Sequence, residues 1–234
     1  MIGFPKFNSG FLASLLPEEV FSSEYLGSFY GFPLIGKEKE ISRSFSSKRL
    51  KEFSVGRKCA RNALSHLGFN DPPILIGTNR EPIWPKNICG SITHCRGYAA
   101  AAVTSDYRFR TIGIDAEPNN PIESEIYSLI MSKKEIKQMG QPNISWDRLT
   151  FSAKESVYKA WFPTYGKWLD FTDCEVMFYL DSHRPNNQPK ELVVGRYHAQ
   201  LLKSKRSYSC NGQWAFVPFF NLLITTTAGS LTES

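Results

Sequence analysis

The stretch TIGIDAEP, residues 111–118, joins a strand pattern, a pair of carboxylates and a chain break in one short segment. Apolar residues alternate along it, as they do on a half-buried β-strand, and Pro118 closes it because proline cannot donate to a sheet ladder. Side chains at i and i+2 of a strand point to the same face, so Asp115 and Glu117 should project together. The segment therefore predicts a strand that ends with two neighbouring carboxylates.

The chain as a whole divides into two halves, in each of which helical patterns come first and strand patterns follow. The first half predicts a helix over 47–67, a strand over 74–76 and a hairpin over 88–104. The pattern restarts after 118–121, with helices predicted over 122–131, 133–139 and 145–162 and strands over 173–180, 192–202 and 214–226. We therefore expect an α+β fold with two similar lobes, residues 1–118 and 119–234.

Composition places few limits on the partner but several on the class of protein. Of the 234 residues, 41% are hydrophobic and 21% charged, which is typical of a globular chain. The net charge of +6 suits an anionic partner, and it equally suits simple solubility. Five cysteines without CxxC spacing argue against a disulfide framework or a zinc site. With neither a secretory signal nor an apolar run of membrane length, the sequence predicts a cytoplasmic protein without a membrane span.

The paired carboxylates indicate a hard divalent cation. Two carboxylates held close together repel, and a cation such as Mg²⁺ relieves that repulsion. Magnesium commonly takes one or two carboxylates together with substrate phosphates, and Mn²⁺ accepts the same oxygen ligands. Asp115 and Glu117 taken alone are equally well explained as solvated carboxylates at a strand end.

The segment FSAKESVYKAW, residues 151–161, adds a third carboxylate and two lysines. On a helix Glu155 and Lys159 share a face at i, i+4, and Lys154 lies beside them. An exposed Glu–Lys pair worth a few tenths of a kcal/mol is the alternative for this segment alone.

A third group is cationic and comes from the predicted helix over 47–67. Arg49 precedes Arg57 and Arg61, which are spaced i, i+4 and could together hold a phosphate. Thr93 and His94 could add donors from the stretch GSITH. A solvated helix face would explain the cations equally well. Together, however, the three groups suit a ligand with a pyrophosphate and a separate phosphate, and coenzyme A is such a ligand.

Five segments, in order, also resemble one family: GRKCARNAL (56–64), EPIWP (81–85), GSITHCRGYAAAAV (90–103), IGIDAEP (112–118) and FSAKESVYKAWFP (151–163). They resemble the 4′-phosphopantetheinyl transferases of the enterobactin-synthase and surfactin-synthase class, and are closest to the bacterial enterobactin branch. The resemblance implies a pseudo-twofold fold in which each lobe is an antiparallel sheet packed with helices and coenzyme A lies in the cleft between the lobes. It also implies magnesium-dependent transfer of phosphopantetheine from coenzyme A to a serine of an apo acyl or peptidyl carrier protein, with release of 3′,5′-ADP.

The resemblance further implies a role for each matching residue. The magnesium ligands would be Asp115, Glu117 and Glu155, of which Glu155 would also take the proton of the serine. Lys154 and Lys159 would hold the pyrophosphate and assist the leaving group. The remaining contacts to coenzyme A would come from Arg49, Arg57, His94, Ser91 and Thr93 around the 3′-phosphate, and from Glu81 and Pro82 beside the adenine.

The resemblance departs at Ile76, where many relatives carry Lys or Arg, and this predicts a weaker grip on the 3′-phosphate unless Arg80 or Lys86 compensates. The basic surface predicts acidic carrier proteins as partners, and the lobed chain predicts a monomer.

Two rival functions remain open: a metal-dependent nuclease or phosphohydrolase, and a catalytically silent module that binds coenzyme A or carrier proteins. The absence of a basic stripe argues against nucleic acid. The intact acidic residues and Lys159 argue against a silent module.

Overall fold

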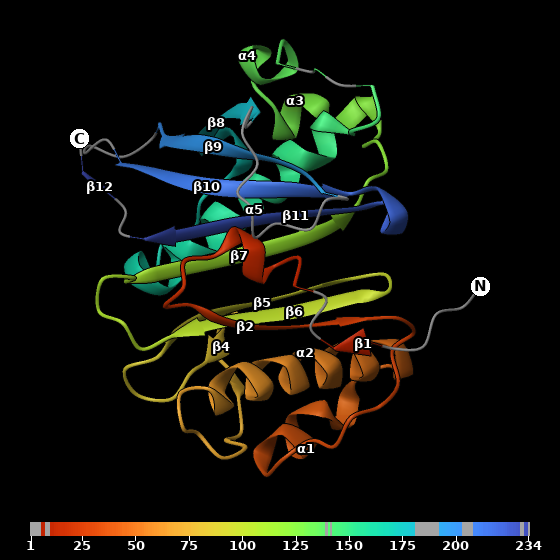
Figure 1. Cartoon of the computed structure of the whole chain (residues 1–234), viewed down its shortest axis with the longest axis vertical. Helices are drawn as coiled ribbons and strands as arrows, with labels where there is room; N and C mark the ends of the chain where they lie inside the picture. Colours follow the sequence, from red (N-terminus) through yellow and green to blue (C-terminus); the bar gives the residue numbers. More distant parts are fainter. Residues whose placement is uncertain are drawn as a thin grey trace.

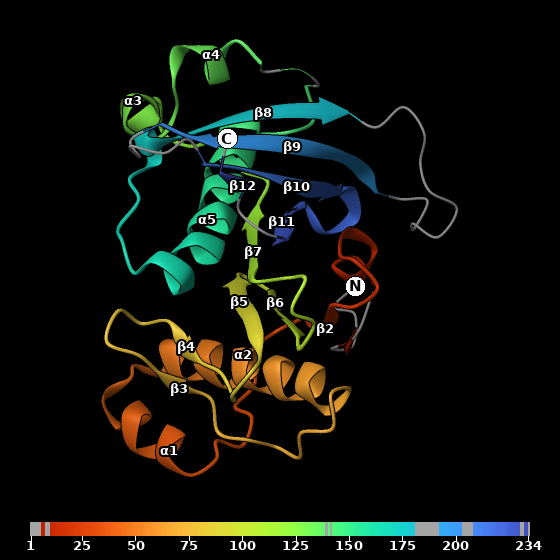
Figure 2. The same ribbon diagram turned by 90° about the vertical axis from the view of Figure 1, so that its left-hand side faces the viewer.

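The computed structural model describes residues 6–7, 10–138, 140, 142–180, 192–202, 208–229 and 232–233. The protein has the expected α+β organisation, with two larger antiparallel sheets stacked along the long axis of the molecule (Figure 1). Each sheet carries one long helix (Figure 2). Within the described ranges, none of the helices combines the length and apolar composition that a bilayer crossing requires.

The first lobe is built on a 4-stranded sheet in the order β1-β2-β6-β5. Its strands are β1 (Lys6–Phe7), β2 (Phe21–Leu26), β5 (Cys89–Cys95) and β6 (Tyr98–Thr104). The alanine-rich β6 is buried on both faces: Ala99 and Ala101 pack toward helix α2 (Ser47–Ser65), whereas Ala100 and Ala102 enter the core shared with the second lobe. Helix α1 (Lys37–Ile41) and the small pair β3 (Leu75–Ile76) and β4 (Pro82–Ile83) complete this lobe.

The second lobe is built on a sheet in the order β7-β11-β10-β9-β8, with β12 paired to β10. The strands are β7 (Thr111–Pro118), β8 (Cys174–Leu180), β9 (Val193–Leu201), β10 (Tyr208–Val217), β11 (Leu222–Gly229) and β12 (Thr232–Glu233). The helices are α3 (Tyr127–Ile130), α4 (Lys133–Ile136) and α5 (Trp146–Tyr165). Short 3₁₀ turns lie at Ala13–Leu15, Ser42–Ser44, Ser124–Ile126, Phe171–Asp173 and Pro218–Phe220.

The main elements expected from the sequence are present, but three assignments need correction. The helix expected over 122–131 is a 3₁₀ turn at Ser124–Ile126 followed by one turn of α-helix at Tyr127–Ile130. The strand at Thr111–Pro118 pairs with β11 and so belongs to the second sheet, which moves the division between lobes from 118 to the connection at 105–110. The single strand expected over 214–226 is two strands, because Pro218 starts a 3₁₀ turn and Asn221 adopts a left-handed conformation with φ 48°. Met139, the expected end of a helix, lies outside the described residues.

Helix α5 crosses β7 at Gly113, where the two backbones approach closely. A Cβ atom at Gly113 would overlap the carbonyl oxygen of Ser156 on the helix. The hydroxyl of Ser156 in turn donates to the carbonyl of Gly113 at 2.8 Å. Glycine is thus needed here for space between backbones rather than for an unusual φ angle. The contact brings the middle of α5 against the strand that carries Asp115.

We expect Gly113→Ala to push α5 away from β7 and to lower the free energy of unfolding by about 1–3 kcal/mol, the usual cost of overpacking a core. Urea denaturation would measure the change. Gly31→Ala is a matched control, because the space around Gly31 is open, and it should change stability by less than about 0.5 kcal/mol. Equal stability of the two variants would mean that the helix does not depend on this contact.

Candidate active site where the two sheets meet

Strands β5 and β7 meet through side-chain hydroxyls rather than through a backbone ladder. The hydroxyl of Ser91 accepts the N–H of Ile114 at 3.1 Å, and that of Thr93 accepts the N–H of Ala116 at 3.1 Å. Both hydroxyl-bearing residues are buried. This corrects their expected role: Ser91 and Thr93 join the lobes, and their side chains are not open donors for a cofactor phosphate.

Asp115 lies at the centre of this junction. Its Oδ1 accepts the Lys159 ammonium at 2.6 Å and the Thr93 hydroxyl at 3.2 Å. Its Oδ2 is buried and accepts no hydrogen bond from any residue that the structure describes. The ammonium of Lys159 also donates to the carbonyl of Ile114 at 3.2 Å. A buried carboxylate oxygen without a partner is costly, and an additional cation or donor at this position would relieve the cost.

The pKa values of the other two predicted ligands, Glu117 and Glu155, are influenced by the charge of Asp115. Burial, followed by repulsion from Asp115, raises the pKa of Glu117 to about 7, although Arg148 lies 3.4 Å away and opposes the rise. Burial also raises the pKa of Glu155, with Lys159 opposing and Asp115 adding to the rise. Among the described residues no three acidic, histidine or cysteine side chains are grouped closely enough to hold a metal ion by themselves. The oxygen donors and the orphaned Oδ2 nevertheless fit a hard divalent cation.

The first lobe contributes cations near this junction. Arg49 Nη1 lies 3.0 Å from Nε2 of His94, and Arg49 also approaches Glu52 at 3.7 Å. Burial lowers the pKa of His94, and the charge of Arg49 adds to this effect even though Glu52 opposes it. A neutral imidazole can accept the hydrogen bond from Arg49. With 42% of its side chain exposed, Arg49 still faces solvent and can meet an anion.

The expected phosphate site of Arg57 and Arg61 divides into two different roles. Arg61 is buried, pairs with Glu38 at 2.9 Å and donates to the carbonyl of Pro33. This corrects its assignment: the guanidinium of Arg61 holds the first lobe together. Arg57 donates to the carbonyl of Ile74 at 3.0 Å, and burial lowers its pKa to about 10, with repulsion from Arg49 contributing. An anion shared by Arg49 and Arg57 would relieve that repulsion.

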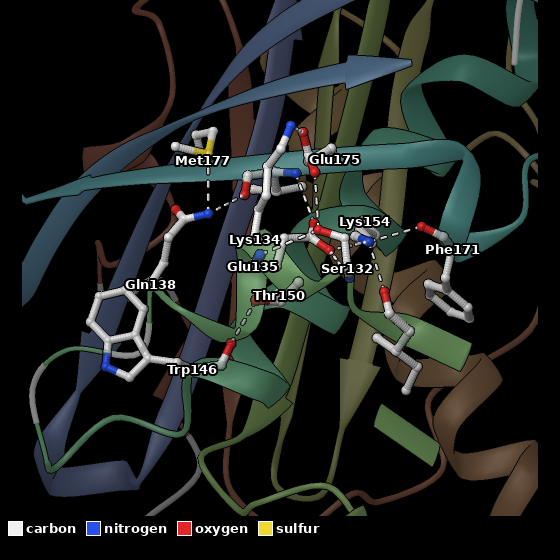
Figure 3. A network of polar contacts seen from close by, with 12 residues as sticks. Ser132, Lys134, Glu135, Gln138, Trp146, Thr150, Lys154, Phe171, Glu175 and Met177 are labelled. Carbon is white, nitrogen blue, oxygen red and sulfur yellow. Dashed lines mark hydrogen bonds and ion pairs between the residues drawn. The ribbon is translucent and has the colours of Figure 1, made fainter. Parts of the chain in front are cut away.

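Lys154 also departs from its expected role. Its side chain is buried, and its ammonium donates to the carbonyls of Ile130 and Phe171 and to the carboxylate of Glu135 (Figure 3). An ammonium has three protons, so these acceptors use all of its donors. This corrects the expectation that Lys154 holds the pyrophosphate.

A hollow of about 220 Å³ opens beside Glu155. Its lining is mostly apolar or aromatic and consists of Lys154, Glu155, Tyr158, Trp168, Leu169, Asp170, Phe171 and Cys174. Trp168 is 72% exposed and packs edge-on against Tyr158, with ring centroids 5.2 Å apart. Burial raises the pKa of Tyr158, and the charge of Glu155 and then that of Glu81, which directly precedes β4, add to the rise.

Three neighbours of the site were absent from the sequence-based set. Arg148 lies two helical turns before Glu155 on the same face of α5, so helical spacing could have found it. Tyr158 adjoins Lys159, but nothing in the sequence says that it lines a hollow. Trp168 follows the helix, and its position depends on the turn at Gly166. Ile76 lies in β3 opposite Pro82, and the two cations expected to compensate for it, Arg80 and Lys86, are exposed.

We expect Thr93→Val to cost about 1–3 kcal/mol of stability, because it leaves the buried N–H of Ala116 without its acceptor and removes a donor from Asp115. Thr93→Ser should restore most of the loss, because it keeps the hydroxyl. Chemical denaturation of both variants tests this. If valine were as stable as serine at position 93, the hydroxyl junction would not contribute to the joining of the lobes.

Comparison with known proteins gives consistent matches across most of the chain. The family model of the 4′-phosphopantetheinyl transferase N-terminal domain matches residues 37–104, and that of the 4′-phosphopantetheinyl transferase superfamily matches residues 111–211. The boundary between these matches coincides with the connection between the two sheets.

Individual relatives agree with the family matches. The chain is 40% identical over 179 residues to 4′-phosphopantetheinyl transferase PptT of Mycobacterium tuberculosis, covering 73% of this chain and 78% of the relative. It is 33% identical over 222 residues to 4′-phosphopantetheinyl transferase Npt of Nocardia iowensis, covering 90% and 97%. Enterobactin synthase component D of Escherichia coli is 36% identical over 118 residues, covering 48% and 55%. The matches to PptT and Npt are thus longer than the match to this member of the enterobactin branch.

Proposed function

The chain belongs to the 4′-phosphopantetheinyl transferase superfamily, and from this premise we propose how its own residues carry out the reaction. It transfers the 4′-phosphopantetheine group of coenzyme A to a serine of a carrier protein. The observation that carries the proposed mechanism is the position of Asp115. Its bonded oxygen is fixed by Lys159, its other oxygen is buried without a described partner, and Glu117 and Glu155 lie within its field.

Asp115, Glu117 and Glu155 would hold a divalent cation, which we take to be Mg²⁺, with Mn²⁺ as an equivalent. Support comes from the all-oxygen donor set, the orphaned Oδ2 of Asp115 and the raised pKa values of the other two carboxylates. When bound there with coenzyme A, the cation would neutralise negative charge on the pyrophosphate.

Lysine and arginine side chains, with His94 as a neutral neighbour, would orient the pyrophosphate and the 3′-phosphate of coenzyme A. Lys159 is already held at the carboxylate of Asp115, so its charge lies where the leaving group forms. Arg49, His94 and Arg57 would take the separate 3′-phosphate, because Arg49 is partly exposed and its repulsion of Arg57 favours an anion between them. Glu81 and Pro82 would border the adenine from the β3–β4 turn.

Glu155 would act as the general base. The oxygen of the carrier serine bonds to the β-phosphorus of coenzyme A, the bond from that phosphorus to the bridging oxygen breaks, and 3′,5′-ADP leaves. The proton of the serine passes to the carboxylate of Glu155, which needs correct placement beside the attacking oxygen. Positioning and electrostatics account for such a phosphoryl transfer without a covalent enzyme intermediate.

The pantetheine arm would lie in the hollow beside Glu155. The arm is a flexible chain of methylene and amide groups, and the aromatic lining from Tyr158, Trp168 and Phe171 offers it apolar contact. This placement puts the arm and the attacked phosphate on the same side of α5 as the proposed base.

Three further properties follow as proposals. The net charge of +6 favours carrier proteins with acidic surfaces. The five cysteines are all free, which suits the reducing cytoplasm. A single chain contains every residue proposed for the site, so a monomer would suffice.

We expect Glu155→Gln to abolish transfer while coenzyme A still binds, because the amide cannot accept the serine proton. The assay incubates the protein with an apo-carrier protein, coenzyme A and Mg²⁺, and weighs the carrier by mass spectrometry for the added phosphopantetheine. Glu18→Gln, an exposed change in the first lobe, should keep the wild-type rate. Removal of divalent cations by a chelator should stop transfer by the wild type. A wild-type rate in Glu155→Gln would exclude Glu155 as the base.

We expect Trp168→Ala to raise KM for coenzyme A roughly tenfold, because removing an aromatic anchor from a binding surface commonly costs about 1–2 kcal/mol. Inhibition by 3′,5′-ADP, which lacks the pantetheine arm, should stay unchanged. Tyr107→Ala is the matched control, since Tyr107 is also exposed but lies in the connection between the sheets. Weaker inhibition by 3′,5′-ADP in Trp168→Ala would argue that Trp168 contacts the nucleotide rather than the arm.

A further inference from the structure

One buried ammonium joins three separate segments to the helix that carries Glu155. Lys154 donates to the carbonyl of Ile130 at 2.7 Å, to Oε2 of Glu135 at 2.9 Å and to the carbonyl of Phe171 at 2.8 Å (Figure 3). These acceptors lie at the end of α3, in α4 and in the turn before β8. The side chain of Lys154 is 2% exposed, and that of Glu135 is fully buried.

Glu135 extends the same network to the edge of the second sheet. Its Oε1 accepts the N–H of Val176 in β8 at 2.8 Å, and its Oε2 accepts the N–H of Ser132 at 2.6 Å as well as the ammonium of Lys154. The pair with Ser132 forms a capping box that starts α4. Each carboxylate oxygen is therefore used, and the charge of Glu135 is matched by Lys154.

Gln138 completes the contact with β8. Its side-chain oxygen accepts the N–H of Phe178 at 2.9 Å, and its side-chain nitrogen donates to the carbonyl of Val176 at 3.2 Å. Strand β8 is the last in its sheet order, so these side chains of α4 and its following turn cover an edge that would otherwise be unpaired. The segment 132–138 is thereby fixed to the sheet on one side and to α5 on the other.

We propose that Lys154 and Glu135 are positioning residues for the transfer reaction, which fix the wall of the hollow beside Glu155. This inference rests on the proposed function. Lys154 and Phe171 both line that hollow, so the bond between them sets the distance from α5 to the opposite wall. A direct contact of Lys154 with pyrophosphate would require its ammonium to leave a fully buried carboxylate, which is strongly unfavourable.

A buried ion pair is often replaceable by apolar groups of similar volume without loss of stability, whereas removing one partner leaves a buried charge unpaired. The informative variant is therefore the double change Lys154→Met with Glu135→Gln, which removes both charges and keeps the side-chain volumes. Thermal unfolding would verify that the double variant is folded. Activity would be measured as kcat and KM for coenzyme A with an apo-carrier protein, and nucleotide binding as Kd for 3′,5′-ADP.

The double variant should lose about tenfold or more in kcat, because small displacements around a reacting centre have large kinetic effects, while its Kd for 3′,5′-ADP stays within about twofold of wild type. A purely structural pair would leave the kcat of the folded double variant unchanged. Lys134→Met is the matched control, because it removes an exposed partner of Glu175 in the same neighbourhood and should keep wild-type kcat and KM.

Two results would overturn the inference. One is a folded double variant with wild-type kcat and KM. The other is a weakened Kd for 3′,5′-ADP in Lys154→Met together with unchanged or tighter binding in Glu135→Gln, since a lysine that contacts phosphate would be released by the loss of Glu135. Absence of transfer by the wild-type chain under the same conditions would instead overturn the proposed function, and the inference with it.

Discussion

The close contact between α5 and β7 is the constraint on which the rest of the site depends. Strand β7 is held on three sides: β11 pairs with one edge, hydroxyls of β5 cover the other edge, and α5 lies directly against Gly113. Asp115 is two residues further along the strand, so its position is determined by both lobes at once. The same contact sets Lys159 on its carboxylate, because one turn of helix separates Lys159 from the residue that touches Gly113.

This geometry separates the two lysines of α5, which lie one residue before and four residues after Glu155 in the sequence. Lys159 points to Asp115 and remains partly exposed, whereas Lys154 points into the second lobe and is buried. Five positions along a helix correspond to a rotation of about 140°, so the two side chains leave the helix in different directions. Helical spacing placed Lys154 beside the face shared by Glu155 and Lys159, but it could not tell whether the side chain of Lys154 faced the substrate or the core.

Much of the fold could be predicted from the sequence because its long periodic segments are decided locally. Helices α2 and α5, the hairpin of β5 and β6, and strand β7 all follow from apolar spacing, proline and glycine. The sheet to which β7 belongs could not be predicted, since pairing with β11 depends on residues more than a hundred positions away. In the site, strand spacing predicted that Asp115 and Glu117 share a face and helix spacing that Glu155 lies on the face of Lys159, whereas the set of metal ligands stays a prediction from the family resemblance. The structural roles of Ser91, Thr93 and Arg61 could not be predicted. The sequence does not indicate whether a hydroxyl or guanidinium group will bind a ligand or a partner within the protein.

The two lobes stabilise their long helices with the same arrangement. In the first, Glu38 on the short helix α1 accepts the N–H of Ile35, three residues earlier, the N–H of Ile74 and the guanidinium of Arg61 on α2. In the second, Glu135 on α4 accepts the N–H of Ser132, again three residues earlier, the N–H of Val176 and the ammonium of Lys154 on α5. In both cases a fully buried glutamate joins a short helix, an extended segment and a cation of the long helix. The lobes differ in what adjoins that cation: Arg61 has no proposed catalytic neighbour, whereas Lys154 directly precedes Glu155. In the first lobe this arrangement contributes only to stability. In the second lobe the same arrangement lies next to Glu155, the residue proposed to take the proton.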